Sequence, residues 1–314
     1  MPPVPLNHVL TVSQFDRPAL DRLFQAADQM RVVAERGGDR RLAGRILATL
    51  FFEPSTRTRL SFESAMLRLG GQVISAEMAS DTTSAVKGET IEDTTRIVQS
   101  YADAIVMRHP MAGAAERAAS VATVPIVNAG DGAREHPSQA LLDVYTIHRE
   151  LGRIDDITVA LVGDLRYGRA PRSLAMLLTR ARNVRLLLAS PPEITMSQDV
   201  LDELTSAGMR FEESVELEAV LPAADVVYMT RVQKERFPDE ASYRAVEGRY
   251  RLAQPHLDAL RADAIIMHPL PRVNEVASEV DRDPRAAYFR QVKNGLYVRM
   301  ALLDWLLGGS ASVR

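Results

Sequence analysis

Short apolar runs alternate with longer segments of helical period along the chain. The strand-like runs are RILATLFF, GQVISAE, ADAIVMRH, VPIVNAG, ITVALVGD, VRLLLAS, VVYMTRV and AIIMHPL. The helical segments between them include residues 58–69, 90–101, 138–151, 172–182 and 199–206. Apolar strands that alternate with helices are typical of parallel sheets covered by helices on both faces.

About four of the apolar runs fall on each side of residue 150. We therefore predict an α/β fold of two doubly wound parallel-sheet domains of similar size, with the active site in the cleft between them. The first domain would span residues 1–150 and the second residues 151–283, with helix 138–151 joining them. A last helix, at about 284–307, has no strand after it and would pack back on the first domain.

Composition narrows the classes of partner. The 314-residue chain has a net charge of −3 and therefore no general basic field, so we expect no nucleic acid partner. The absence of cysteine rules out disulfides and Cys-based metal sites and fits a reducing compartment. The N-terminus lacks the pattern of a secretion signal, and no apolar run approaches the roughly 20 residues of a membrane span. We expect a soluble, cytoplasmic protein with no membrane partner.

Polar groups that suit anions follow most of the predicted strands. Arginine or histidine occurs in each of the segments EPSTRTR, RHP, GDGAREHPSQ, GDLRYGR, TRVQKER and HPLPR. Loops are polar in general, which accounts for one or two of these segments. Because ligands of open parallel sheets bind at the carboxyl ends of the strands, the whole set favours an anionic ligand held between two domains.

The segment FFEPSTRTRLSFE carries the densest group of anion-binding side chains. Ser55 or Thr56 can cap the helix that follows, and a helix N-terminus attracts anions. Arg57 adds a guanidinium suited to phosphate. A capped helix with solvated arginines is the simpler alternative, but the density of groups favours a phosphate site. Arg59 lies four residues before Glu63, which predicts a structural ion pair on the helix surface.

The common nucleotide motifs are absent. The chain contains no G-x-x-x-x-G-K-[ST] and no G-x-G-x-x-G after a strand, which argues against a nucleoside triphosphate or a dinucleotide. No spacing suggests a metal site, and no G-x-S-x-G elbow is present. A phosphate site without a nucleotide motif predicts a small phosphorylated substrate and no cofactor.

Several motifs, in order over residues 45–300, resemble the transcarbamoylase family, which binds carbamoyl phosphate: FFEPSTRTRLSFESAMLRLGG, MRHP, HPSQALLDVYTI and HPLPR. GDLRYGRAPRSLA and MTRVQKERF resemble its aspartate branch, and the cysteines typical of the ornithine branch are missing. The resemblance implies carbamoyl transfer from carbamoyl phosphate to the amine of L-aspartate, giving N-carbamoyl-L-aspartate and phosphate in de novo pyrimidine biosynthesis. Transfer to ornithine or a related amine, and a non-catalytic anion-binding homologue, stay open as alternatives.

The resemblance also implies roles for the residues that match the carbamoyl phosphate motifs. The phosphate would be held by Ser55, Thr56, Arg57 and Thr58. Arg108 would bridge the phosphate and the carbonyl oxygen, and His136 would donate to that oxygen. The carbamoyl NH2 group would contact Gln139 and backbone carbonyls near Leu270 and Pro271, whose shared peptide bond is cis in the family. The residues expected to act in catalysis are Arg57, Thr58, Arg108 and His136.

The aspartate substrate carries two carboxylates and needs cationic partners for both. By resemblance, Arg169 would bind the α-carboxylate, and Arg231 with Gln233 would bind the side-chain carboxylate. Each arginine alone would more simply be a surface cation. An arginine at this place would repel the cationic side chain of ornithine, so Arg231 favours an acidic substrate.

The loop SDTTSAVKGE (residues 80–89) reaches into a neighbouring subunit's site in the family. The resemblance implies that Ser84 and Lys87 contact phosphate and aspartate there, so that the enzyme works as a homotrimer with shared active sites. Thr83 is the alternative to Ser84 as the contacting hydroxyl. Whether such a trimer also binds regulatory chains or dihydroorotase stays open.

Overall fold

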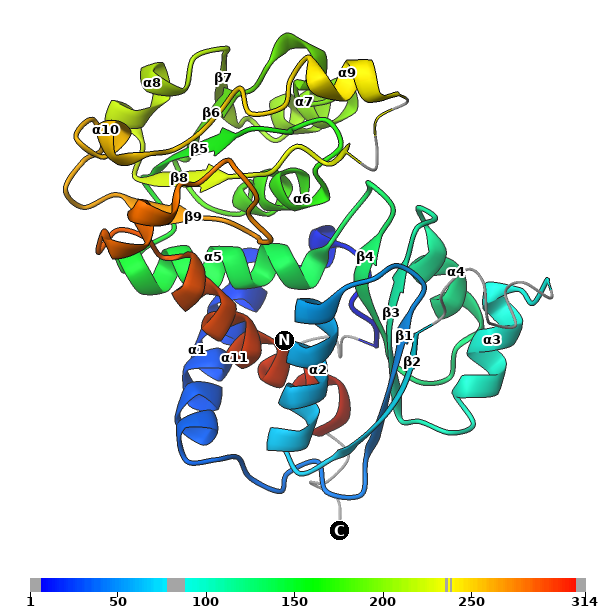
Figure 1. Cartoon of the computed structure of the whole chain (residues 1–314). Coiled ribbons are helices and arrows are strands. Elements are labelled where there is room, and N and C mark those ends of the chain that lie inside the picture. The colour runs from blue at the N-terminus through cyan, green and yellow to red at the C-terminus, as the bar shows by residue number, and fades with distance from the viewer. Residues whose placement is uncertain (1–6, 78–87, 235–236, 238, 309–314) are drawn as a thin grey trace. The chain divides into compact units, whose positions relative to one another are not determined.

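The computed structural model describes residues 7–77, 88–234, 237 and 239–308 (Figure 1). The chain divides into two compact units: Met1–Leu142 with Lys293–Arg314, and Asp143–Val292. Both divisions fall inside helices, α5 (Pro137–Leu151) and α11 (Tyr288–Leu307). The pattern of apolar runs predicts domain limits after residue 150 and before residue 284. The cleft expected between two domains stays a prediction.

The first unit is built on a parallel four-stranded sheet in the order β2-β1-β3-β4. The strands are β1 (Ile46–Phe51), β2 (Gln72–Glu77), β3 (Ala104–His109) and β4 (Ile126–Asp131). Its helices are α1 (Arg17–Glu35), α2 (Thr56–Arg68), α3 (Ile91–Val98), α4 (Ala114–Val121) and the short η1 (Val12–Gln14). Helices stand on both sides of this sheet (Figure 1). On one face of the sheet, Leu50 and Ile105 pack in an apolar cluster with Ala118 of α4. On the other face, the Thr49 hydroxyl donates a hydrogen bond to Glu63 of α2.

The second unit is built on a parallel five-stranded sheet in the order β7-β6-β5-β8-β9. The strands are β5 (Thr158–Val162), β6 (Arg185–Ala189), β7 (Arg210–Ser214), β8 (Val226–Met229) and β9 (Ile265–Met267). Its longer helices are α6 (Arg169–Leu178) and α7 (Gln198–Ser206). The short ones are α8 (Leu217–Val220), α9 (Glu240–Arg244), α10 (Gln254–Leu257), η3 (Pro192–Ile194), η4 (Leu221–Ala223) and η6 (Ser278–Arg282). One apolar cluster joins this sheet to α8 and α10.

The predicted fold class of two doubly wound parallel-sheet units is confirmed, but the expected number of strands in the second half is wrong. The additional strand, β7, has the sequence RFEES, and all five of its residues are exposed or only partly buried. It lies at the edge of the sheet and pairs with β6 alone. An edge strand with little buried surface needs no apolar run, so the pattern gave no signal for it.

All the predicted helices differ from the structure in their bounds by one to four residues at one or both ends, and α11 and α6 are two examples. Helix α11 begins at Tyr288 rather than near residue 284, because the backbone at 285–287 pairs with Ile266 of β9 through two hydrogen bonds, each 2.8 Å. Helix α6 begins at Arg169 and ends at Leu178, three and four residues before the limits expected from 172–182. Arg169 is therefore the first helical residue rather than part of the preceding turn.

Among the residues that the structure describes, no helix combines the length and the apolar character needed to cross a membrane.

Candidate active site

Each sheet has a topological switch point. The chain first adds strands on one side of the first strand of the sheet and then adds the remaining strands on its other side. In the first unit the switch lies between β1 and β3, and in the second it lies between β5 and β8. The crevice outside the carboxyl ends of such strands is the usual ligand site of open parallel sheets. Arg108 lies within β3, one residue before its end, and the segments that follow β1, β5 and β8 carry Arg57, Arg169 and Arg231.

After β1 the chain turns into helix α2, which begins at Thr56 with Ser55 at the N-cap position. The predicted cap position is confirmed for Ser55, but its side chain makes no capping hydrogen bond. Thr56 and Arg57 are exposed at this helix end, whereas Thr58 is buried. The N-terminus of α2 thus presents hydroxyl groups, a guanidinium and the positive end of the helix dipole together.

Arg108 lies at the end of β3, next to this helix start. It is in register with Phe51, the last residue of β1, and its carbonyl accepts a 2.9 Å hydrogen bond from the Phe52 N–H. Its Nε atom lies 3.1 Å from the Glu53 carboxylate, and both side chains are mostly buried. Glu53 therefore orients the Arg108 guanidinium at the switch point, a role that the sequence analysis did not assign.

Arg59 has the structural position predicted for it. Its Nε atom lies 3.7 Å from the Glu63 carboxylate, which confirms the i,i+4 ion pair. Glu63 also accepts a 2.9 Å hydrogen bond from the hydroxyl of Thr49 in β1. The pair therefore fastens α2 to the sheet.

His109, the neighbour of Arg108, makes contacts that support the fold. Its Nδ1 atom accepts a 3.0 Å hydrogen bond from the Met111 N–H, and its ring packs on Phe52 with ring centres 4.7 Å apart. Partial burial lowers the pKa of His109, which favours the neutral ring.

His136 and Gln139 are buried at the start of α5, in the loop that follows β4. Asp131, the last residue of β4, holds this loop: its carboxylate accepts hydrogen bonds from the Glu135 N–H at 3.2 Å and the Gly113 N–H at 2.9 Å. The Gln139 N–H donates to the His136 carbonyl at 2.9 Å, as the first turn of the helix requires. The first unit therefore holds both side chains at the carboxyl end of β4.

In the second unit, buried Asp164 ties together the two segments that carry the predicted aspartate site. Its carboxylate accepts hydrogen bonds from the Tyr167 N–H at 2.8 Å and the Gln233 N–H at 3.3 Å. The Gln233 side-chain amide donates in turn to the Tyr167 carbonyl at 3.3 Å. Arg169 is buried at the first position of α6, directly after this turn. The structure thus brings Gln233 beside the turn that precedes Arg169.

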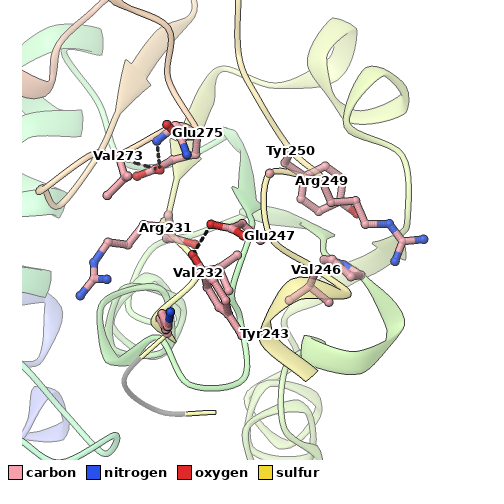
Figure 2. A pocket seen from close by; sticks show the side chains of 15 residues that line it. Arg231, Val232, Tyr243, Val246, Glu247, Arg249, Tyr250, Val273 and Glu275 are labelled. Carbon is pink, nitrogen blue, oxygen red and sulfur yellow. Dashed lines mark hydrogen bonds between the residues drawn. The ribbon is translucent and has the colours of Figure 1, made fainter. Parts of the chain in front are cut away.

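Arg231 follows β8 and lines a pocket of about 80 Å³ in the second unit (Figure 2). Its side chain extends away from the hydrogen-bonded pair of Tyr243 and Glu247, whose oxygens are 2.7 Å apart. This hydrogen bond raises the pKa of Tyr243 to about 12, so the phenol stays neutral. Arg249 and Lys234 also line the pocket, together with the acidic Glu247 and Glu275.

The segment HPLPR follows β9. The Leu270–Pro271 peptide bond is cis, which confirms the expectation taken from the family resemblance. His268 at the start of the segment is buried, and its ring nitrogens lie 2.7 Å from the Leu270 nitrogen and 2.7 Å from a Glu275 carboxylate oxygen. This contact between His268 and Glu275 was not predicted from the sequence.

Of the other predicted site residues, Thr83, Ser84 and Lys87 lie outside the described residues. Within the described part of the chain, no group of three or more His, Asp or Glu residues could hold a metal ion.

Two family models match adjacent parts of the chain. Residues 7–149 match the carbamoyl phosphate-binding domain, and residues 155–306 the aspartate/ornithine-binding domain, of the aspartate/ornithine carbamoyltransferases. The chain therefore belongs to the aspartate/ornithine carbamoyltransferase family.

Similar proteins of known name lie on the aspartate side of this family. The chloroplastic aspartate carbamoyltransferase 1 of Pisum sativum is 53% identical over 306 residues, covering 97% of this chain and 79% of its own. The aspartate carbamoyltransferase catalytic subunit of Methanopyrus kandleri is 51% identical over 302 residues, covering 96% and 97%. The crystal structure of the Trypanosoma cruzi aspartate transcarbamoylase in complex with carbamoyl phosphate and aspartate superimposes with a TM-score of 0.90 at 42% identity, covering 98% and 99%.

Proposed function

We propose that this chain transfers the carbamoyl group from carbamoyl phosphate to the amine of L-aspartate, giving N-carbamoyl-L-aspartate and phosphate. The observation that carries the proposal is the placement of cationic side chains at the switch points of both sheets. Relatives over nearly the full chain that are named aspartate carbamoyltransferases support it. This reaction would serve de novo pyrimidine biosynthesis.

The first unit would bind carbamoyl phosphate. The start of α2 supplies the phosphate ligands Ser55, Thr56, Arg57 and Thr58. Arg108, oriented by Glu53, bridges the phosphate and the carbonyl oxygen, while His136 donates to that oxygen. Gln139 would contact the carbamoyl NH2 group, and the resemblance gives the same role to the backbone carbonyls near Leu270 and Pro271, which belong to the second unit.

The second unit would bind L-aspartate. Arg169 takes the α-carboxylate, and Arg231 and Gln233 take the side-chain carboxylate. Gln233 is well placed for this role because Asp164 and Tyr167 already hold it beside the turn that precedes Arg169. An arginine at position 231 disfavours ornithine, and the chain has none of the cysteines expected of an ornithine enzyme.

Catalysis would come from positioning and charge. The aspartate amine attacks the carbonyl carbon, a C–N bond forms, and the C–O bond to phosphate breaks. Thr58, Arg108 and His136 stabilise the oxyanion of the tetrahedral intermediate, and both substrates are held in attack geometry. The departing phosphate accepts the proton that the amine loses, so the reaction needs no separate base.

The active enzyme would be a cytoplasmic homotrimer in which Ser84 and Lys87 of one subunit complete the site of the next. This part of the proposal rests on the family resemblance of residues 80–89. A further regulatory or dihydroorotase partner is compatible with it.

The activity is tested by incubating the purified protein with carbamoyl phosphate and L-aspartate and quantifying N-carbamoyl-L-aspartate and phosphate. We expect equimolar formation of both products, and loss of both in the His136→Ala variant. Phosphate release at the same rate without any amine would overturn the proposal, because it would indicate hydrolysis.

A further inference from the structure

A continuous chain of buried polar groups in the second unit leads to the backbone of the segment HPLPR. The Tyr228 hydroxyl and the Gln291 amide donate to the two oxygens of Asp143, at 2.7 and 2.6 Å. The Gln291 oxygen accepts from the His268 backbone N–H at 3.0 Å. All four side chains are at least nine-tenths buried. The backbone of His268 is therefore fixed to α5 and α11 within this unit.

The partners of the His268 ring determine which nitrogen carries the proton. The Leu270 backbone N–H can only donate, so Nδ1, 2.7 Å away, is the acceptor. The proton of the neutral ring then lies on Nε2, which donates to Glu275 Oε1 at 2.7 Å. This tautomer uses both nitrogens and leaves the Leu270 N–H paired.

Glu275 selects this tautomer. Its second carboxylate oxygen accepts from the backbone N–H groups of Val273 and Asn274, at 3.1 and 3.0 Å. Burial alone would raise the pKa of Glu275, but the hydrogen bonds from His268 and the backbone outweigh it and lower the pKa. Glu275 is therefore an acceptor on both oxygens and requires a donor at His268 Nε2.

Leu270, whose N–H donates to His268, has a backbone conformation that is unusual for any residue other than glycine. Its φ of 55° lies in the left-handed region, which costs a non-glycine residue on the order of 1–3 kcal/mol unless the surroundings enforce it. The hydrogen bond to His268 Nδ1 is one such restraint, since it fixes the Leu270 N–H relative to the ring.

We propose that His268, held as the Nε2–H tautomer by Glu275, is a positioning residue that orients the backbone carbonyls near Leu270 and Pro271 toward the carbamoyl NH2 group. The inference rests on the proposed function, in which these carbonyls contact that group. His268 touches no substrate itself. It acts by accepting the Leu270 N–H, and the loss of that one bond should weaken recognition of the NH2 group and leave recognition of phosphate unchanged.

Two substitutions test the hydrogen bonds of the two imidazole nitrogens separately. In His268→Asn, the amide oxygen replaces Nδ1 and can still accept from Leu270, while the bond to Glu275 is lost. In His268→Gln, the amide nitrogen replaces Nε2 and can still donate to Glu275, while the bond to Leu270 is lost. Each variant leaves one former partner of the His268 ring without its hydrogen bond. We therefore expect the two variants to lose similar amounts of stability, so that each is a control for the other.

The readout is the affinity for carbamoyl phosphate divided by the affinity for inorganic phosphate, measured for each folded variant by calorimetry. We expect His268→Gln to lower this ratio about tenfold, the effect of one hydrogen bond, and to lower kcat as well. His268→Asn should keep the ratio within about twofold of the unsubstituted protein. Equal ratios in all three proteins, or the larger loss in His268→Asn, would overturn the proposal.

Glu275→Gln supplies a second test should His268→Gln fail to fold. Its amide oxygen must face the two backbone N–H groups of Val273 and Asn274, so its NH2 group faces His268 Nε2 and favours the other tautomer. Nitrogen NMR of protein labelled at its six histidines should then show the His268 proton moving from Nε2 to Nδ1. The affinity ratio should fall as in His268→Gln. An Nδ1–H tautomer in the unsubstituted protein would overturn the proposal directly.

The test distinguishes this inference from the proposed function. If the unsubstituted protein forms no N-carbamoyl-L-aspartate, the proposed function fails. If it forms the product and the His268→Asn and His268→Gln variants have the same affinity ratio, only the positioning role fails.

Discussion

At the scale of single residues, two arginines of the first unit have different surroundings. Arg108 ends strand β3 at the switch point, where Glu53 orients it. Arg59 lies on α2 beside Glu63 and helps to fasten that helix to the sheet. Both are arginines beside a glutamate, so residue type alone does not separate their roles. Their positions relative to the carboxyl ends of the strands do.

Arg108→Ala should therefore abolish most of the activity. One lost donor to the oxyanion typically lowers kcat by about 10²–10³-fold, and Arg108 also holds the phosphate, so we expect at least this loss. Arg59→Ala is the matched control and should retain kcat within a few-fold. Steady-state kinetics of both purified variants measure the difference. Similar losses in the two variants would contradict the role given to Arg108.

Arg231→Ala should weaken the binding of aspartate selectively. A charge-assisted hydrogen bond is worth about 1.5–3 kcal/mol, so the KM for L-aspartate should rise about 10- to 100-fold. The dissociation constant for carbamoyl phosphate should not change, because Arg231 would contact only the second substrate. Arg249→Ala serves as the control, since Arg249 lines the same pocket and pairs with Glu193 at 3.4 Å. An unchanged KM in Arg231→Ala would argue against the assigned role.

At the scale of elements, buried strands could be predicted from the sequence and edge elements could not. Strand β5 is flanked by strands on both sides and reads as an apolar run, whereas β7 is an exposed edge strand with no such signal. The start of α11 was predicted too early because a long-range pairing of residues 285–287 with Ile266 overrides the local helical pattern.

In the candidate site too, local sequence motifs could be recognised and contacts between distant segments could not. Motifs at strand ends indicate which side chains are candidates for anion binding, because the ends of parallel strands meet at one edge of a sheet. The groups that orient those side chains depend on contacts between distant segments. Glu53 lies beside Arg108 because of the register of β1 with β3, and Gln291 contacts His268 from helix α11. No sequence spacing reveals such contacts.

A cluster of Arg272, Asp281 and Tyr288 also links the start of α11 to η6, and its contribution to the stability of the fold depends on pH. Asp281 accepts hydrogen bonds from Arg272 and from the Tyr288 hydroxyl, and the Arg272 bond lowers the pKa of Asp281. The stabilisation is present above the ordinary aspartate pKa and is lost as the pH falls through the lowered value.

Asp281→Asn should therefore lower the free energy of unfolding at pH 7 by up to about 1 kcal/mol, since the pair is partly exposed. The difference from the unsubstituted protein should shrink as the pH falls through the lowered pKa of Asp281, below which both proteins lack the charge. Urea unfolding at several pH values measures this. A difference that grows on acidification would contradict the ionised state of Asp281.

At the scale of the whole molecule, the proposed sharing of active sites between subunits has a consequence for mixtures of variants. Lys87 lies outside the described residues, and its role rests on the family resemblance. Arg108→Ala and Lys87→Ala should each have little activity alone. When the two are unfolded together and refolded, sites that combine an intact Arg108 with an intact Lys87 from a neighbour should regain activity. Activity no greater than the sum of the parents would indicate that each chain completes its own site.

A competition between two amines tests whether this chain carbamoylates aspartate. The protein is given carbamoyl phosphate with equal concentrations of L-aspartate and L-ornithine, and the carbamoylated products are separated and quantified. We predict N-carbamoyl-L-aspartate as the product, with no carbamoylated ornithine above the uncatalysed background. Carbamoylated ornithine as the main product would contradict the assignment of Arg169, Arg231 and Gln233 to an acidic substrate.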